Sequence, residues 1–215
     1  MLVYFHFLFY NQTANSREFC KDDRGASGKA WSPDSVQEFN RGCWISMESE
    51  KLSGVSTDQM KNLVGNIMWF WGNLHQKWRS AAEDEYGLEA ALKLELKIID
   101  SIGKSHARGI KSIFNVPKGI AGFVEAYRFT PENFVEEFKI SERTNRHVVV
   151  YNPSCSAQKA RTERGKREFP CKESGILYFT GFAREIDPDI KFSCIVCPPD
   201  DHPDDCFCKW KIDMT

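Results

Sequence analysis

The sequence lacks the surplus of positive charge that a nucleic-acid-binding surface requires. Its 29 Lys and Arg are balanced by 30 Asp and Glu, which leaves a formal net charge of −1. Binding to a phosphate backbone needs basic side chains in excess on one face, so we expect no nucleic-acid partner. The one basic cluster, residues 159–168, is typical of a solvated helix face.

A hydrophobic run long enough to cross a membrane is also missing. The apolar opening, residues 1–10, has about half of the roughly 20 residues that a spanning helix needs. It also lacks the basic flank and the small-residue cleavage site of a signal peptide. We therefore predict a cytoplasmic protein with no membrane partner.

Regular apolar patterning is absent from residues 11–46, which are polar and rich in turn-forming residues. Such a segment cannot bury enough apolar surface to order itself. We expect residues 1–46 to be a disordered extension and the folded domain to begin near Met47. Within that domain we predict a helical part, residues 47–130, and an α+β cysteine-rich part, residues 131–215.

Three signatures of common enzymes and scaffolds are absent as well. The sequence contains no glycine-rich phosphate loop, no nucleophile elbow and no internal repeat. The chemistry of the protein must therefore be sought in other residues.

Apolar residues at helical spacing predict a long helix that begins at Thr57. The stripe follows steps of three and four residues: Leu63, Ile67, Phe70, Leu74 and Trp78. Because large aromatic side chains dominate core packing, we expect the stripe to be buried in the core; lining a pocket is the alternative. The same periodicity predicts a helix over residues 88–113, continuous or restarted, and a short one over residues 117–129.

The pattern changes after residue 130. Alternating or β-branched segments predict strands over residues 133–140, 146–152, 188–196 and 206–213, and helical patterns cover residues 155–167 and 172–186. Helices that precede two hairpins indicate an α+β fold. We predict N-terminal helices followed by an antiparallel β-sheet with covering helices and a Cys-rich metal-binding hairpin.

The cysteines are concentrated near the C-terminus. Cys194 and Cys197 form a C-x-x-C pair, whose short spacer lets both thiolates turn toward one ion. Cys206 and Cys208 follow after a turn-forming loop, so a hairpin brings the two pairs together. Cys171 opens a predicted helix, whose N-terminal partial charge favours a thiolate. With no export signal, the compartment is reducing and disulfides are the minority interpretation.

We therefore predict a metal site with the ligands Cys171, Cys194, Cys197 and Cys208. The alternate ligands are Cys206, Cys155 and His202. Thiolates suit Zn²⁺, and an iron–sulfur cluster is the alternative cofactor. Packed, inert thiols also stay open, because cysteine is often buried as a small hydrophobe.

A catalytic cysteine is a further alternative. Cys155 is the candidate nucleophile, with His147 or His202 as its base. Arg161 would then clamp a substrate carboxylate. These residues lie on different predicted elements, so their contact cannot be inferred from spacing.

The residues from Cys171 through the C-x-x-C pair to "CFCKWKI" resemble the zinc-binding half of the 4-vinyl reductase domain. The family's cysteines fall on Cys171, Cys197 and Cys208 (or Cys206), and Cys194 stands where the family has an acidic residue. Residues 57–215 also look like a family of uncharacterised prokaryotic cytosolic proteins, related in pattern to L-2-amino-thiazoline-4-carboxylic acid hydrolase-like proteins. These resemblances imply an α+β domain with a small-molecule pocket.

Three functions compete on this basis. The first is a metal-binding sensor or binding module for a small molecule, with zinc as the expected metal. The second is a hydrolase of a small cyclic or amide substrate, which needs an open metal position or an activated thiolate. The third is an iron–sulfur redox protein. The expected partner is a small-molecule ligand, and a homodimer is left open.

Overall fold

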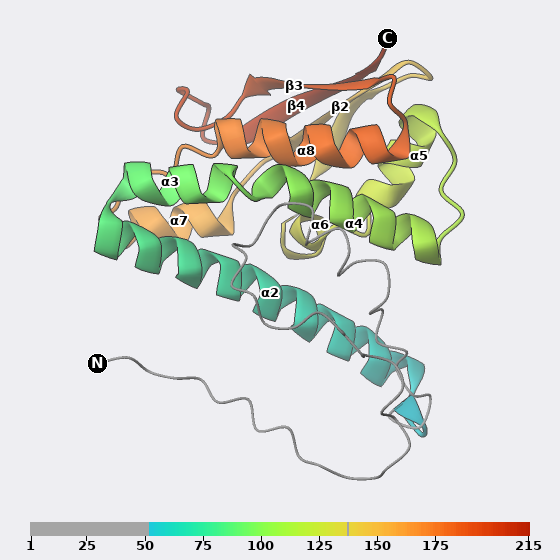
Figure 1. The fold of residues 1–215 in the computed structure, drawn as a ribbon, viewed down its shortest axis with the longest axis horizontal. Coiled ribbons are helices and arrows are strands. Elements are labelled where there is room, and N and C mark those ends of the chain that lie inside the picture. The colour runs from blue at the N-terminus through green and yellow to red at the C-terminus, as the bar shows by residue number, and fades with distance from the viewer. Residues whose placement is uncertain (1–51, 137) are drawn as a thin grey trace, which may run out of the picture. The chain divides into compact units, whose positions relative to one another are not determined.

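The computed structural model describes residues 52–136 and 138–215 of the chain, in which the helices gather on one side of a sheet (Figure 1). Residues 55–215 make up one unit. Its helices are α2 (Thr57–Tyr86), α3 (Leu88–Leu96), α4 (Ile99–Ile113), α5 (Gly119–Tyr127), α6 (Pro131–Val135), α7 (Ser156–Thr162) and α8 (Lys172–Ile186). The expected α+β class, with helices preceding an antiparallel sheet, is confirmed. The prediction for residues 1–46 lies outside the described residues.

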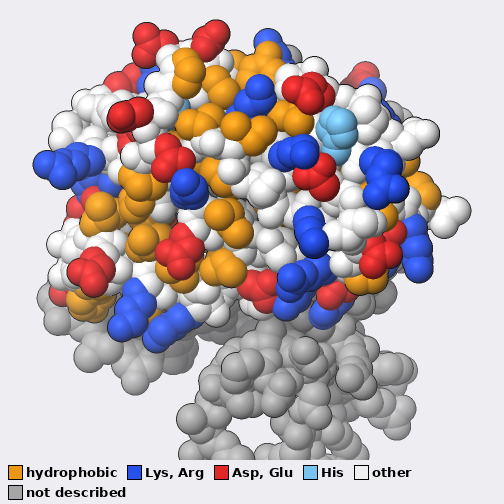
Figure 2. Space-filling view, turned by 90° about the horizontal axis from the view of Figure 1, so that it is seen from above, with side chains coloured by type: hydrophobic (Ala, Val, Ile, Leu, Met, Phe, Trp, Pro, Cys, Tyr) orange, Lys and Arg blue, Asp and Glu red, His pale blue; other side chains and the backbone are white. Residues whose placement is uncertain are grey.

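The sheet has four antiparallel strands in the order β1-β2-β4-β3. Their bounds are β1 (Lys139–Arg143), β2 (His147–Asn152), β3 (Ile190–Val196) and β4 (Cys208–Met214). The last strand therefore lies between β2 and β3, and β3 and β4 form the predicted hairpin. Seen from the sheet side, Lys and Arg lie among Asp and Glu, with hydrophobic side chains between them (Figure 2).

Helix α8 packs between the sheet and α4, and its aromatic side chains fill the core. Phe179 stacks on Phe192 of β3, and Phe182 packs edge-on against Phe123 of α5. Helices α4 and α8 approach closely at Gly103, where a Cβ atom would overlap the carbonyl group of Tyr178. The close approach explains why a helix-weakening glycine stands in the middle of α4.

The expected burial of the α2 stripe is wrong. The stripe from Leu63 to Trp78 stays exposed, with 43% of Leu63 and 70% of Trp78 accessible. The residues that follow the stripe residues by one position contact the rest of the unit instead. Trp71 contacts His106 of α4, and Arg79 binds Glu95 of α3. The apolar spacing identified an apolar helix face but not the face that packs within the chain.

Two predicted boundaries are also wrong. Residues 131–135 form helix α6, and the strand that was expected over residues 133–140 begins only at Lys139. Pro131 occupies the first helical position, where its fixed φ favours a helix. Helix α7 stops at Thr162 rather than residue 167, since Gly165 has a φ of 72° that a helix cannot accommodate.

None of the helices in the described residues is long and apolar enough to cross a membrane.

Candidate metal centre

Three thiols converge where α8, β3 and β4 meet. Cys171 is the N-cap residue of α8, Cys197 directly follows β3, and Cys208 is the first residue of β4. The sulfur atoms of Cys171 and Cys197 are 3.5 Å apart. The Cys208 side chain lies close enough to Cys197 for each of the two thiols to shift the pKa of the other. Cys197 lies 26 positions after Cys171, and Cys208 lies further still, so the fold brings the three thiols together.

Backbone and ion-pair contacts fix this meeting point. The amide of Lys172 donates to the carbonyl oxygen of Pro198 at 3.0 Å, which ties the start of α8 to the segment after β3. The Lys172 ammonium also pairs with Asp200 at 2.7 Å. The amide of Phe207 donates to the carbonyl oxygen of Asn152, so the start of β4 is held against the end of β2. The three thiols are therefore placed by elements on both sides of the hairpin loop.

The three thiols differ in the direction in which their surroundings shift the pKa. Hydrogen bonding from Cys197 lowers the pKa of Cys171, and the positive charge of Arg79 acts in the same direction. Hydrogen bonding from Cys197 also lowers the pKa of Cys208. The pKa of Cys197 is raised in return, because its contacts with Cys171 and Cys208 and its burial all favour the protonated form. Two sulfurs are thus favoured as thiolates around a third.

Two polar side chains that the sequence analysis did not predict, Gln158 and Trp210, lie beside these sulfurs. The side-chain amide nitrogen of Gln158 lies 3.5 Å from the Cys171 sulfur, and the same side chain exchanges two 2.8 Å hydrogen bonds with the Phe169 backbone. The indole nitrogen of Trp210 is buried without a partner at full hydrogen-bond geometry among the described residues. It nevertheless lies close enough to Cys208 to lower the pKa of that thiol. Donors of this kind orient and stabilise metal-bound thiolates.

The spacing of the sulfurs can be compared with that of a zinc site. Two thiolates on a tetrahedral zinc ion, each about 2.3 Å from the metal, are about 3.8 Å apart. The 3.5 Å between Cys171 and Cys197 is close to this value. In the part of the chain that the structure describes, however, no group of three or more His, Cys, Asp or Glu side chains is arranged to hold a metal ion. We call the three thiols a row, because Cys197 is the thiol neighbour that lowers the pKa of both Cys171 and Cys208.

Two further predicted thiols lie near this row. Cys194 is paired with Trp210 across the hairpin, and burial raises its pKa to about 11, against the opposing charge of Lys172. Cys155 precedes α7, and burial raises its pKa to about 12. Negative charge on Cys171 or Cys208 would raise the pKa of either thiol further. Both are therefore neighbours of the cluster without a thiol hydrogen bond to it.

The remaining alternate ligands have other contacts. The imidazole of His202 lies 3.1 Å from the carboxylate of Glu168 and packs on the ring of Phe207. Burial lowers the pKa of His202, but hydrogen bonds to the Pro203 carbonyl and Glu168 outweigh it and raise the pKa overall. The Cys206 sulfur lies 3.9 Å from the carbonyl oxygen of Cys208, and burial raises its pKa. Neither residue joins the three-thiol row.

The candidate catalytic residues are not brought together. Arg161 is buried and binds both carboxylate oxygens of Glu83 in α2, so its guanidinium is already paired. His147 lies at the start of β2, 3.6 Å from Glu142, whereas Cys155 follows the other end of that strand. A base and a carboxylate clamp beside Cys155 are not found among these side chains.

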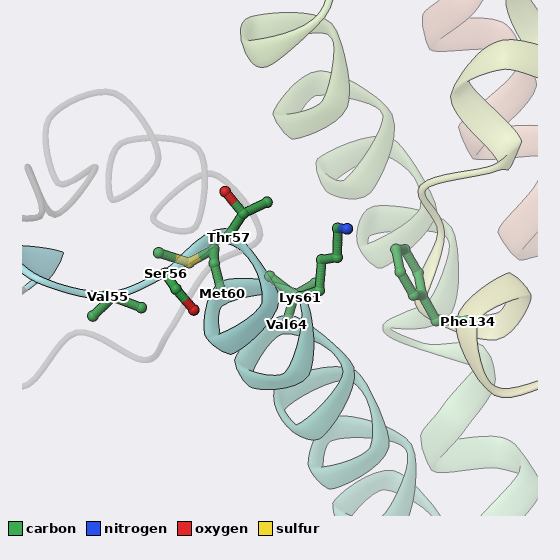
Figure 3. A pocket seen from close by; sticks show the side chains of 7 residues that line it. All are labelled: Val55, Ser56, Thr57, Met60, Lys61, Val64 and Phe134. Atoms are coloured by element: carbon green, nitrogen blue, oxygen red, sulfur yellow. The ribbon is translucent and has the colours of Figure 1, made fainter.

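The described residues line two hollows with room for a small molecule. One of about 310 Å³ lies outside the start of α8, next to the thiols, and is lined by Leu92, Pro170, Lys172, Glu173, Ile176 and Pro199. The other, of about 490 Å³, lies between the first turns of α2 and Phe134 of α6, and Lys61 extends toward Phe134 in Figure 3. The tryptophans of α2 line neither hollow, which differs from the expected aromatic pocket.

A family comparison covers most of this structure. The sequence model of DUF6125, a family of unknown function, matches residues 53–214. The chain belongs to DUF6125. The match begins just before α2 and includes every described element of the fold and all three thiols. No curated protein and no solved structure matches the chain. The resemblances to the 4-vinyl reductase domain and to thiazoline hydrolase-like proteins therefore stay predictions.

Proposed function

We propose that this DUF6125 domain is a zinc-binding module whose ligands are Cys171, Cys197, Cys208 and Cys194. The observation that carries the proposal is the convergence of three thiols from α8, β3 and β4, with two sulfurs 3.5 Å apart. Two thiols with lowered pKa values, Cys171 and Cys208, flank Cys197 beside buried N–H donors, and thiolates of this kind suit a soft divalent cation. Cys194 is assigned as the fourth ligand because its side chain neighbours this row.

A four-thiolate site would act as a clamp. Zinc held by four cysteines has no position for water, so it contributes folding free energy rather than an activated nucleophile. Cys171 would fix the start of α8, while Cys197 and Cys208 would fix the two ends of the hairpin loop. Gln158 would orient the Cys171 thiolate, and Trp210 would donate its indole N–H to Cys208. The bound zinc would thus hold the start of α8 and the hairpin loop rigidly beside the hollow outside α8.

The small-molecule part of the proposal rests on that hollow. Its volume of about 310 Å³ is at the lower end of the range for ligand pockets, about 300–1,000 Å³. Leu92 and Ile176 provide apolar walls, and Lys172 and Glu173 provide one charge of each sign. A small, partly apolar ligand with polar ends fits this lining. We infer that the metal clamp positions the hollow and does not itself react.

Elemental analysis of anaerobically purified protein tests the metal proposal. We expect one zinc per chain in the wild type and in Cys206→Ser, the matched control from the same loop. Zinc should be lost in Cys197→Ser, together with a large drop in the thermal unfolding midpoint, because the central thiol of the row is removed. Wild-type protein without any bound metal, after purification without chelators, would refute the proposal.

The same experiment distinguishes the open alternatives. Comparison of Cys194→Ser with Cys155→Ser identifies the fourth ligand, since only replacement of the true ligand should cause the loss of zinc. Iron with sulfide and visible absorption would indicate the iron–sulfur redox protein, because the same thiolates hold such clusters. A colourless protein that contains zinc would favour the binding module. The hydrolase alternative stays a prediction, and the raised pKa of the buried Cys155 thiol does not favour a thiolate nucleophile.

A further inference from the structure

A row of exposed apolar side chains follows one face of α2. It consists of Leu63, Ile67, Phe70, Leu74 and Trp78, which we call the α2 stripe. Between 43% and 70% of each side chain is accessible, with Leu63 the least and Trp78 the most exposed. A soluble surface helix normally turns such a stripe toward a core. In the part of the chain that the structure describes, the stripe lies at the surface instead.

The composition of α2 around the stripe is that of an interface. Residues 62–76 contain no Asp, Glu, Lys or Arg, although 27% of the whole chain is charged. Asn62, Asn66 and Asn73 flank the stripe instead. Depletion of charged residues and enrichment of aromatic ones distinguish the cores of protein interfaces from ordinary surface. A surface exposed only to water would not need four helical turns free of charge.

The position of α2 leaves the stripe uncovered by the other described residues. The helix is the one farthest from the sheet in Figure 1, and its opposite side is held by ion pairs to α3 and α7. Arg79 binds Glu95, and Glu83 binds Arg161. The helix is therefore anchored through one face while the stripe lies on another. Anchoring of this kind presents a preformed surface, which reduces the entropic cost of binding.

We propose that the α2 stripe is the interface of a homodimer, in which α2 of one protomer packs antiparallel against α2 of its partner across a two-fold axis. In an isologous contact of this kind the axis passes near the middle of the stripe, beside Phe70. Leu63 of each protomer then lies opposite Trp78 of the other, and Ile67 lies opposite Leu74. The stripe is self-complementary in this register because a small apolar residue faces a large one at its ends.

The distribution of charged residues along α2 favours a second copy of the chain as the partner and favours the antiparallel orientation. Antiparallel pairing places Lys77 opposite Val64, whereas parallel pairing would place two copies of Lys77 side by side. Like charges at an interface are destabilising, so the antiparallel arrangement is favoured. A membrane surface is a poorer occupant, because interfacial helices attract anionic lipids with Lys and Arg beside the apolar face. Residues 62–76 have none.

The size of the stripe agrees with a dimer of modest stability. Phe70 and Trp78 expose 60% and 70% of their surface, so each would bury roughly 100–150 Å² if aromatic side chains bury 150–250 Å² in full. With Leu63, Ile67 and Leu74 the stripe would bury on the order of 500 Å² per protomer, before its flanking residues are counted. Standard interfaces bury about 800 Å² per partner.

Sedimentation velocity of the full chain tests the interface. We expect wild-type protein at micromolar concentration to have twice the chain mass of 24.8 kDa. Leu63→Glu should halve the mass, because a charge would be buried opposite Trp78. Adding Trp78→Lys to Leu63→Glu should restore the dimer, since the new charges face each other in the antiparallel register. The matched control Leu63→Glu with Ile67→Lys carries the same charges out of register and should stay monomeric.

Further controls keep each outcome decisive. Ile113→Glu changes a side chain on α4 that is 72% exposed and should leave the dimer intact. Circular dichroism confirms folding, and Phe70→Glu replaces Leu63→Glu if that variant does not fold. A monomeric wild type would overturn the proposal and mean that another part of the chain or a different partner covers the stripe. A dimer that persists in Leu63→Glu and Phe70→Glu would overturn it as well.

Discussion

At the scale of single residues, a buried polar chain links three helices. The Nδ1 atom of His106 in α4 lies 2.9 Å from the hydroxyl oxygen of Tyr178 in α8. The Tyr178 hydroxyl donates to a carboxylate oxygen of Glu132 in α6 at 3.0 Å. Burial lowers the pKa of His106 to about 4 and raises the pKa of Glu132. His106 is therefore neutral in the folded protein at neutral pH.

The pKa of His106 makes stability depend on pH. An unfolded chain protonates this histidine near its ordinary pKa of about 6.5, whereas the folded protein resists protonation until about pH 4. The unfolded state thus binds more protons between these values, so stability is lost as the pH falls from 6.5 toward 4. We expect His106 to account for about 2 kcal/mol of the loss in unfolding free energy between pH 7 and pH 5.

Urea unfolding at both pH values measures this loss. His106→Phe should show a smaller decrease than the wild type, because the titrating group is absent. An equal decrease in both proteins would refute the assigned role of His106.

The residues of the thiol cluster were partly accessible to prediction from the sequence. Cys171, Cys197 and Cys208 carry a local signal, because the C-x-x-C spacing and a cysteine at a helix start are recognisable in the chain. Gln158 and Trp210 carry none: they are common core residues whose side chains reach the thiols only in the folded protein. The chain from His106 to Tyr178 spans 72 positions, and no spacing rule predicts such a contact.

At the scale of elements, α2 is anchored by ion pairs. Arg79 pairs with Glu95, Arg161 pairs with Glu83, and both guanidinium groups lie over the ring of Phe169. The Arg161 side chain is 7% accessible and that of Glu83 is 14% accessible. Removing one partner of a buried pair leaves a charge without compensation, which costs more than the pair contributes.

Replacement of Arg161 tests this anchoring. We expect Arg161→Leu to lower the unfolding free energy by about 3 kcal/mol, because the largely buried Glu83 carboxylate loses both hydrogen bonds from Arg161 and keeps only the 3.7 Å contact with Lys166. The double variant Arg161→Leu with Glu83→Leu should recover part of the loss. Arg128→Leu breaks an exposed pair with Glu125 and should change stability by less than about 1 kcal/mol. Equal effects of Arg161→Leu and Arg128→Leu in urea unfolding would contradict the account.

The contact between α4 and α8 depends on the absence of a side chain at Gly103. Gly103→Ala would force the Tyr178 backbone away and should cost about 3 kcal/mol, as overpacked sites do. Gly65 of α2 has nothing within 4 Å of an added Cβ atom, so Gly65→Ala should raise stability by about 0.5–1 kcal/mol through helix propensity. Thermal unfolding of both variants provides the comparison, and a harmless Gly103→Ala would disprove the close approach.

Elements with clear end signals were predicted best. The predicted bounds of α8 are those observed, since Pro170 and Pro188 enclose a continuous helical pattern. Helix α6 was missed although Thr130 and Pro131 form a helix start, because apolar residues at alternate positions were interpreted as a strand. The predicted burial of the α2 stripe was wrong, because periodicity indicates which face of a helix is apolar and not what covers that face.

At the scale of the whole molecule, the sequence predicted the α+β class because the change from helical to alternating patterning is plain in the chain. It did not predict that β4 would lie between β2 and β3, since strand order depends on long-range pairing. That order is what places Cys208 beside the residues at the start of α8. The proposed metal centre is thus a product of the topology as much as of the cysteine spacing.

X-ray absorption at the zinc edge of the purified full-length protein tests the central claim most directly. The account predicts stoichiometric zinc surrounded by sulfur atoms at about 2.3 Å. Substitution of Cys197 by Ser should remove that signal, and substitution of Cys206 should preserve it. Protein without bound metal, or zinc held only by nitrogen and oxygen at about 2.0 Å, would contradict it.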